Sequence, residues 1–348
     1  MAKYRQKTVV KIIEENPEII KMELDDSSRA YCFPQINGTV SSGDEVIVNT
    51  TAVDLNLGTG GWHFVVWNLS NSDLETPRGG HIMKMRYSPL QLDVGVEEEK
   101  PTWNNEHTDL GGLPVIAAPL HSQLAPIASF LKSHNSDINI AVAVSDGAAL
   151  PLALSDLVRN LKAKKLIDLT ITFGHAFGGD YESINIYTAL LTAKNICKAD
   201  VVIATMGPGI VGTNTAYGFS GIEVAHHLDS AQNLGAKTYG VLRASQADPR
   251  ERHRGISHHS ITTFSKATNL KHNLGLISDN EMSDQMVEQL NISGLFDSHN
   301  VHNLESIGIV DLMESYGLDV KSMGRSARED ELFNEMSAAA ARLVLKGQ

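Results

Sequence analysis

The chain of 348 residues carries 29 Lys and Arg residues against 41 Asp and Glu residues, a formal net charge of −12 at pH 7. General binding to nucleic acid or to an anionic membrane surface needs extended positive potential, so this charge argues against both. Hydrophobic residues make up 42% of the chain and charged residues 20%, the composition of a soluble globular protein with a sizeable core. A binding site for an anion would therefore need a local group of basic residues.

The start of the chain and its cysteines bear on the compartment. Charged residues at Lys11, Glu14 and Glu15 interrupt the first apolar run, which is not the pattern of a signal peptide. Cys32 and Cys197 are too few and too far apart for a disulfide framework or a thiolate metal site. We therefore expect a cytoplasmic protein.

Residues 1–108 predict a small all-β domain. Short runs rich in β-branched and aromatic residues are separated by turn-forming residues, and they lie at 7–14, 19–25, 29–34, 44–55 and 63–70. Several strands at close spacing with frequent turns are typical of a small barrel or sandwich. A polar and charged segment follows at 90–112, so we place the domain boundary there.

Residues 109–348 predict a doubly wound, mostly parallel α/β domain of the Rossmann-like type. Apolar strand candidates lie at 114–120, 138–145, 166–174, 200–209 and 237–245. They alternate with helix candidates at 122–134, 149–164, 182–198 and 221–235, as in a parallel sheet covered by helices. The last part of the chain, from about residue 279, predicts further helices, including one over 330–346.

Polar or small residues follow each of the five strand candidates. In an open parallel sheet, ligands bind beyond the carboxyl ends of the strands, where the loops converge. The residues at these ends are His121, Asp146, His175 with Asp180, the glycine-rich segment 206–215, and Arg243. Asp146 before Gly147 would also make an ordinary turn, but the five ends together predict a site.

The segment 206–215 contains Gly207, Gly209 and Gly212 in a G-x-G-x-x-G spacing directly after an apolar strand. Such glycines let backbone N–H groups approach a phosphate at a helix start, and Thr213 and Thr215 add hydroxyl groups. The alternative is a tight turn with helix-capping residues.

A full dinucleotide site is the less favoured interpretation of this segment. The unit is the fourth of its series rather than the first, and the expected acidic residue after the next strand is missing. Arg243 lies near that position instead, where it would suit the 2′-phosphate of NADP.

The stretch PRERHRGISHHS, residues 249–260, is strongly basic in an acidic chain. Together with Arg243, its residues Arg252 and Arg254 would neutralise a bound anion, because guanidinium groups match phosphate and carboxylate oxygens bidentately. The alternative is a solvated basic loop in which Asp248 and Glu251 pair with these arginines.

Histidines and carboxylates supply the candidate metal ligands. His121, Asp146, His253 and His258 form a nitrogen and oxygen donor set of the kind that binds zinc, manganese or iron. His253 and His258 can converge across Gly255. His258 and His259 are adjacent, so we expect their side chains to point to different sides, away from a shared metal.

Two long runs resemble a known family. The run 174–221, with the motifs GHAFGGD and MGPGIVGTNT, and the run 243–259, with RHRGISHH, resemble a bacterial family of uncharacterised proteins over nearly the whole chain. That resemblance implies no activity. The shorter run HRGISHHS, at 253–260, is similar to the histidine–arginine–glycine signature of some membrane-bound metal-dependent hydrolases, which adds to the case for a metal.

We therefore expect an enzyme that acts on a small phosphorylated or otherwise anionic metabolite, by metal-assisted hydrolysis or phosphoryl transfer. The glycines and threonines at 207–215 would hold the anion, and the arginines would stabilise the transition state. His175 and Asp180, with His253 and His258, would supply metal ligands or the general acid and base. The alternatives are an NADP-binding oxidoreductase and a non-enzymatic sensor of a small ligand. A homo-oligomer is compatible with the sequence, and we expect no nucleic-acid or membrane partner.

Overall fold

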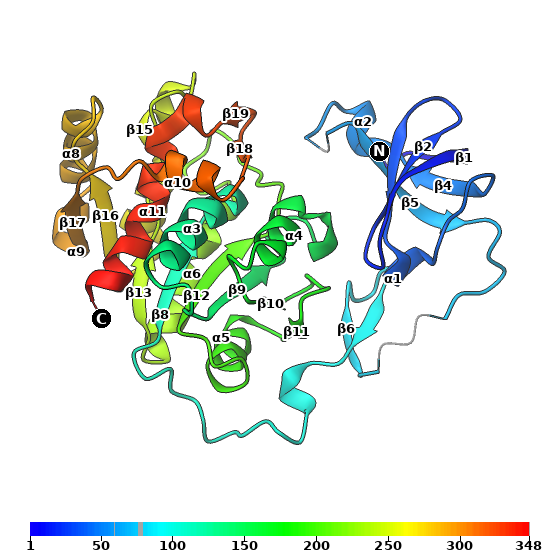
Figure 1. Ribbon diagram of the computed structural model, residues 1–348, viewed down its shortest axis with the longest axis horizontal. Helices are drawn as coiled ribbons and strands as arrows, with labels where there is room; N and C mark the ends of the chain where they lie inside the picture. The colour runs from blue at the N-terminus through cyan, green and yellow to red at the C-terminus, as the bar shows by residue number, and fades with distance from the viewer. Residues whose placement is uncertain (59, 76–78, 348) are drawn as a thin grey trace. The chain divides into compact units, whose positions relative to one another are not determined.

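The computed structural model describes residues 1–58, 60–75 and 79–347 (Figure 1). The chain divides into two compact units, Met1–Gly95 and Val96–Gln348. No helix that the structure describes is both long enough and apolar enough to cross a membrane.

The first unit is built on a closed barrel with the strand order β1-β2-β3-β5-β4. Its strands are β1 (Tyr4–Glu15), β2 (Ile20–Leu24), β3 (Arg29–Cys32), β4 (Glu45–Asn49) and β5 (Trp62–Asn68). The long strand β1 pairs with both β2 and β4 and so closes the sheet, which leaves the barrel no unpaired edge. The prediction of a small barrel or sandwich is confirmed as a barrel.

Alternating side chains fill the barrel. In β2, Ile20, Met22 and Leu24 are buried, whereas Lys21 and Glu23 between them are partly exposed. The barrel core consists of Val9, Ile20, Met22, Leu24, Ala30, Cys32, Val40, Val46, Val48 and Val65. The unit also contains the short helices α1 (Pro34–Asn37) and α2 (Thr51–Asp54) and the antiparallel pair β6 (Ile82–Lys84) and β7 (Leu92–Val94).

One predicted strand of this unit is shorter than expected. The run 44–55 predicts a strand throughout, but β4 ends at Asn49 and α2 begins at Thr51. The Asn49 Oδ1 atom accepts a hydrogen bond from the Thr51 backbone N–H at 3.0 Å, and this local bond favours a turn over continued strand pairing.

The second unit contains an eight-stranded parallel sheet with the order β11-β10-β9-β12-β8-β13-β16-β17. Its strands are β8 (Pro114–Ala118), β9 (Ile140–Ser145), β10 (Leu169–Thr172), β11 (Tyr181–Glu182), β12 (Val201–Met206), β13 (Lys237–Gly240), β16 (Asn273–Ile277) and β17 (Asn300–Leu304). Five of them, β8, β9, β10, β12 and β13, lie where the sequence predicts strands.

Helices cover both faces of this sheet (Figure 1). The helices described in this unit are α3 (Leu124–His134), α4 (Asp156–Ala163), α5 (Ile186–Asn195), α6 (Glu223–Asn233), α7 (His258–Thr262), α8 (Ser283–Ile292), α9 (Leu295–Ser298), α10 (Ile309–Ser315) and α11 (Glu331–Lys346). The chain crosses from β8 to β9 in one direction through α3 and from β12 to β13 in the other through α6. Right-handed crossovers that run in opposite directions lie on opposite faces, so the domain is doubly wound and Rossmann-like, as predicted.

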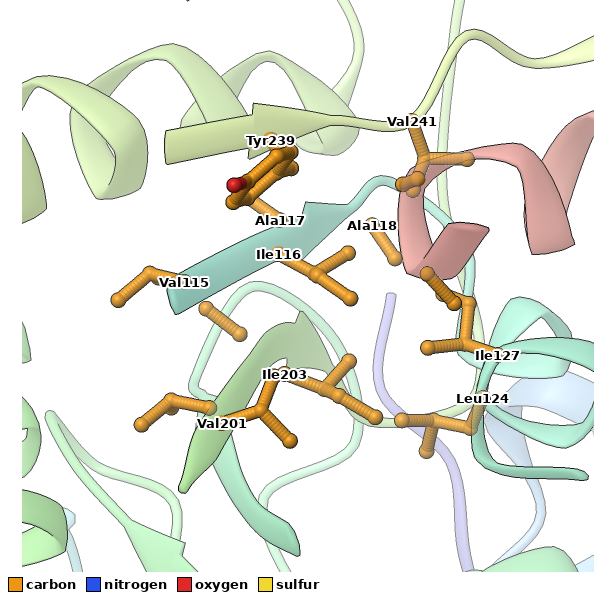
Figure 2. Close-up of a cluster of buried hydrophobic side chains, with 14 of the residues drawn as sticks. Val115, Ile116, Ala117, Ala118, Leu124, Ile127, Val201, Ile203, Tyr239 and Val241 are labelled. Carbon is orange, nitrogen blue, oxygen red and sulfur yellow. The ribbon is translucent and has the colours of Figure 1, made fainter. Parts of the chain in front are cut away.

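The hydrophobic core of the second unit surrounds its central strands. Figure 2 shows Ile116 of β8 and Ile203 of β12 near Leu124 and Ile127 of α3, and all four side chains are fully buried. Consecutive residues of β8 are buried because helices cover both faces of the sheet. Burial of each such aliphatic side chain contributes roughly 1.5–3 kcal/mol to folding.

The contact between β16 and α11 gives a test of this packing. A Cβ atom on Gly275 would lie 2.6 Å from the Ala339 Cβ atom. We therefore expect Gly275→Ala to lower the free energy of unfolding by about 1–3 kcal/mol, measured by urea denaturation. The control Ile292→Ala, at a side chain that is 80% exposed, should change it by no more than about 0.5 kcal/mol. Equal stability of the two variants would contradict the packing described here.

Candidate functional site

The loops that carry the predicted site residues meet at the carboxyl edge of the parallel sheet. After β9 the chain continues to β10 on one side, and after β12 it continues to β13 on the other. Neighbouring strands whose connections leave in opposite directions open a crevice between their carboxyl ends. In this sheet, such crevices lie between β9 and β12 and also between β8 and β13, because β8 leads to β9 on one side and β13 leads to β16 on the other.

A cavity of about 320 Å³ lies at this edge, next to the end of β12. Gly207, Pro208, Gly209 and Ile210 line one side of it, and the segment 317–323 lines another. The remaining lining residues are Leu120, His121, Ser122, Asp156, Leu157 and Asn160. The mixed apolar and polar lining and the volume suit a small metabolite.

The rest of the glycine-rich segment is arranged differently. The Thr213 and Thr215 hydroxyl oxygens lie 2.8 Å apart, and both bond the backbone of Gly218, which closes an exposed turn. A Cβ atom on Gly212 would lie 3.0 Å from a ring carbon of His259. The first two predicted glycines thus face the cavity, the third faces a histidine, and the two threonines bond within their own turn.

His121 is held between two other elements of the edge. Its Nδ1 atom lies 2.9 Å from the Met206 carbonyl oxygen, and its Nε2 atom lies 2.6 Å from the Ser155 Oγ atom. Ser155 in turn caps α4 by accepting a hydrogen bond from the Val158 backbone N–H at 3.0 Å. Burial lowers the pKa of His121 to about 4. Both of its nitrogens are therefore engaged, and the ring stays neutral.

Arg243 is buried and belongs to an ion-pair network. Its Nη2 atom donates to the Asp248 carboxylate at 3.0 Å, and its Nη1 atom lies 3.0 Å from the His253 Nδ1 atom. Arg250 binds the same carboxylate at 2.9 Å, and Arg325 reaches it at 3.4 Å. Burial raises the pKa of Asp248, but the hydrogen bonds of Arg250 and the charge of Arg243 outweigh this and hold it well below its usual range.

The other two predicted arginines, Arg252 and Arg254, have exposed side chains. The charge of Arg252 acts on the neighbouring imidazoles, where it contributes to lowering the pKa of His258 and His259. The backbone carbonyl of Arg254 accepts a hydrogen bond from the Gln289 side chain at 3.2 Å, which fixes this end of the loop.

His253, His258 and His259 form a compact cluster, in which one ring nitrogen from each lies within 4.8 Å of the other two. The expectation that His258 and His259 point to different sides is wrong, because their ring centroids lie 4.2 Å apart. The two residues begin α7, where Phe219 stacks on the His259 ring at 4.0 Å. This contact, with the space left by Gly212, holds His259 beside its neighbours.

The environment keeps all three imidazoles neutral. Burial, then the charges of Arg243 and Arg250, lower the pKa of His253 to about 3. Burial, then His258, lower the pKa of His259 to about 4, and burial also lowers that of His258. The Nε2 atoms of His258 and His259 are buried and have no hydrogen-bond partner in the part of the chain that the structure describes. Neutral imidazole nitrogens of this kind are the form that binds a metal ion.

The remaining candidates lie outside this cluster. The Asp146 Oδ2 atom accepts a hydrogen bond from the His175 backbone N–H at 2.8 Å, which ties the ends of β9 and β10 together. Asp180 binds the Lys162 Nζ atom at 2.6 Å and the Thr170 hydroxyl at 2.8 Å. Of the four predicted metal ligands, His253 and His258 thus lie within ligand spacing of each other and of His259. His121 and Asp146 do not belong to this group.

The sequence analysis missed Glu223, the first residue of α6. Its Oε1 atom accepts a hydrogen bond from the Ser145 Oγ atom at 2.5 Å, at the end of β9. Burial raises the pKa of Glu223 to about 7, with the charge of Asp146 adding to this and the Ser145 hydrogen bond opposing it. The sequence offered one indication of this residue, namely an acidic side chain near the start of the helix that is predicted after the glycine-rich segment.

The fold and its edge define a two-unit protein in which a closed five-stranded barrel accompanies a Rossmann-like domain with a ligand-sized cavity and a histidine cluster. A family model described as "Protein of unknown function (DUF3866)" matches residues 29–341, and the chain belongs to this family. The resemblance to a family of unknown function is thereby confirmed. A comparison with curated proteins finds no match.

The buried ion-pair network gives a second test. We expect Asp248→Asn to lower the free energy of unfolding at pH 7 by about 3–5 kcal/mol, because it leaves buried arginine charge unpaired. The native pKa of Asp248 is lowered, so its stabilisation is present above its unfolded pKa of about 3.9 and lost as pH falls through the lower native value. Urea denaturation should therefore show the difference between wild type and variant shrinking below about pH 4. A difference that stays constant down to about pH 2 would contradict this role.

Proposed function

We propose that this protein is a metal-dependent enzyme that acts on a small anionic metabolite by hydrolysis or phosphoryl transfer. The observation that carries the proposal is the convergence of His253, His258 and His259, each with a ring nitrogen within 4.8 Å of the others. Three neutral imidazoles are the donor set of catalytic zinc sites, which leave a fourth position for water or substrate.

Metal binding would rearrange the histidine cluster in two ways. The His253 Nδ1 atom lies 2.7 Å from the Ser257 Oγ atom and accepts a hydrogen bond from the Arg243 Nη1 atom at 3.0 Å, which places the proton of the neutral ring on Nε2. Metal binding through Nε2 requires this proton to move to Nδ1, where it would be donated to Ser257 in place of the arginine bond. Bonds of about 2.1 Å to one ion bring imidazole nitrogens to roughly 3.4 Å from each other, so binding requires a small rotation of the rings. Zinc, manganese or iron bound there would supply a Lewis acid and a water that ionises near neutral pH.

The surroundings support an anionic substrate. Arg252 is exposed beside the cluster, and Gly212 leaves the backbone close to His259. The large cavity shares Leu120 and Ile210 with a hollow of about 10 Å³ that His259 and Arg243 line. The cavity and the cluster are thus neighbours at one edge of the sheet. Arg243, which the oxidoreductase alternative assigns to a 2′-phosphate of NADP, has its terminal nitrogens engaged by Asp248 and His253.

The metal is tested by elemental analysis of the protein after dialysis against zinc, manganese or iron. We expect about one equivalent in the wild type and a metal affinity about 100-fold or more weaker in His258→Ala and His259→Ala. The control His302→Ala, at an exposed ring of β17, should keep its metal, and circular dichroism should show all three variants folded. A metal-free wild type, or equal metal content in the ligand variants and the control, would remove the metal from the proposal.

A further inference from the structure

Glu223 is a carboxyl group for which the fold provides few favourable contacts. It is partly buried at the start of α6, and the hydrogen bond that its side chain has among the described residues comes from the Ser145 hydroxyl group. No cation pairs with it in that part of the chain. Asp146, the residue after Ser145, adds a charge of the same sign nearby. Such an environment disfavours the ionised form of the group.

Two other buried glutamates of the chain show how a structural carboxylate is held. Glu335 accepts hydrogen bonds from the backbone N–H groups of Ile307 at 3.1 Å and Ile309 at 2.8 Å. Glu182 accepts from the Gly178 backbone N–H at 2.7 Å and is 9% exposed. Backbone donors stabilise a buried carboxylate in its charged form. Among the residues that the structure describes, Glu223 receives no backbone donor, so its charged form is less well stabilised than those of Glu335 and Glu182.

The loops beside Glu223 are shaped around two carboxylates. A Cβ atom on Gly147 would lie 2.5 Å from a Glu223 carboxylate oxygen, and a Cβ atom on Gly174 would lie 2.5 Å from an Asp146 carboxylate oxygen. A larger residue at either glycine would force the carboxylate to move from its observed position. Both acids lie at the carboxyl end of β9, beside one of the two crevices where the topology predicts a ligand.

Glu223 is also close to the histidine cluster along the chain. Phe219 stacks on His259, and Glu223 follows after the single 3₁₀ turn Ser220–Ile222. At about 2 Å of rise per residue, such a turn carries the backbone only about 8 Å from Phe219 to Glu223. Val224, the next residue, lines the same small hollow as His259 and Arg243. The start of α6 therefore lies beside the hollow that His259 lines.

We infer that Glu223 is the general base and general acid of the proposed hydrolysis, an assignment that rests on the proposed function for its reaction. Its carboxylate takes a proton from the attacking water as the water oxygen forms a bond to the phosphorus or carbonyl carbon of the substrate. The same proton then passes to the leaving oxygen as its bond to that centre breaks, which restores the carboxylate.

The protonation of Glu223 suits this double role. A group that gives and takes a proton works best when its pKa lies near the operating pH, and burial and Asp146 raise that of Glu223 to about 7. Of the other titratable groups around it, His226 and His227 lie on its own helix, and burial lowers the pKa of His227 to about 3 and keeps it neutral. His175 binds Asp146 through its backbone.

The test compares Glu223→Gln with Glu335→Gln in the zinc-reconstituted full chain, with p-nitrophenyl phosphate as the probe. We expect Glu223→Gln to lower kcat by about 100-fold or more, to remove the acid limb of the pH–rate profile, and to keep its zinc and its Tm. Infrared difference spectra of the wild type should show a carboxyl group that titrates near pH 7 and is missing in Glu223→Gln. Glu335→Gln should lose stability and keep that titration.

Three results would overturn the assignment. An unchanged kcat and pH profile in Glu223→Gln, with zinc bound and hydrolysis intact, would remove Glu223 and leave the proposed function standing. A drop in the Tm of Glu223→Gln as large as that of Glu335→Gln, with the infrared titration retained, would make Glu223 a structural residue. A wild type that binds no zinc and hydrolyses no probe would overturn the proposed function and the assignment together.

Discussion

The Asp248 carboxylate, which is 1% exposed, is the group on which the arrangement of the site depends. It binds Arg243 after β13, Arg250 in its own loop, and Arg325 of the hairpin formed by β18 (Lys321–Ser322) and β19 (Arg325–Ser326). Removing one partner of a buried ion pair costs several kcal/mol, so these three segments are held together strongly. Because Arg243 also contacts His253, and the adjoining Ser257 caps α7, the same network positions the histidine cluster. Segment 317–323 of the cavity wall leads into the same hairpin, which links the cavity to the network as well.

Local patterns in the sequence were enough to predict most of the fold. Apolar β-branched runs predicted the five strands at the centre of the sheet, because a strand that is buried on both faces consists of consecutive apolar residues. The periodic run at 330–346 predicted α11, because a helix that is buried along one stripe repeats its apolar residues every three or four positions. Strands β11, β16 and β17 were missed. β11 (Tyr181–Glu182) is only two residues long. β16 is short and contains Gly275, whereas β17 (Asn300–Leu304) lies at the sheet edge with three exposed residues, so neither shows the pattern of a buried strand.

The candidate site was predicted less completely, because the type of a residue does not reveal which other residues its side chain bonds in the fold. The strand-end rule pointed to the loops at the carboxyl edge of the sheet. It could not show that Asp180 binds Lys162, a residue on α4, or that His121 lies between Met206 and Ser155. The adjacency of His258 and His259 suggested that their rings diverge, whereas stacking on Phe219 brings them together. Glu223 could not be found in this way, since its raised pKa depends on burial and on a neighbour that lies 77 positions earlier in the sequence.

In the proposed function, three imidazoles from one loop and one helix start would hold a single catalytic metal ion. X-ray absorption spectroscopy of the zinc-loaded protein tests it most directly, because scattering from imidazole rings counts the histidine ligands. The structure predicts about three nitrogen ligands at about 2.0–2.1 Å with one further oxygen ligand, and fewer imidazoles in His259→Ala. Zinc bound by carboxylate oxygens or sulfur, or a histidine count unaffected by His259→Ala, would contradict the assignment of the cluster.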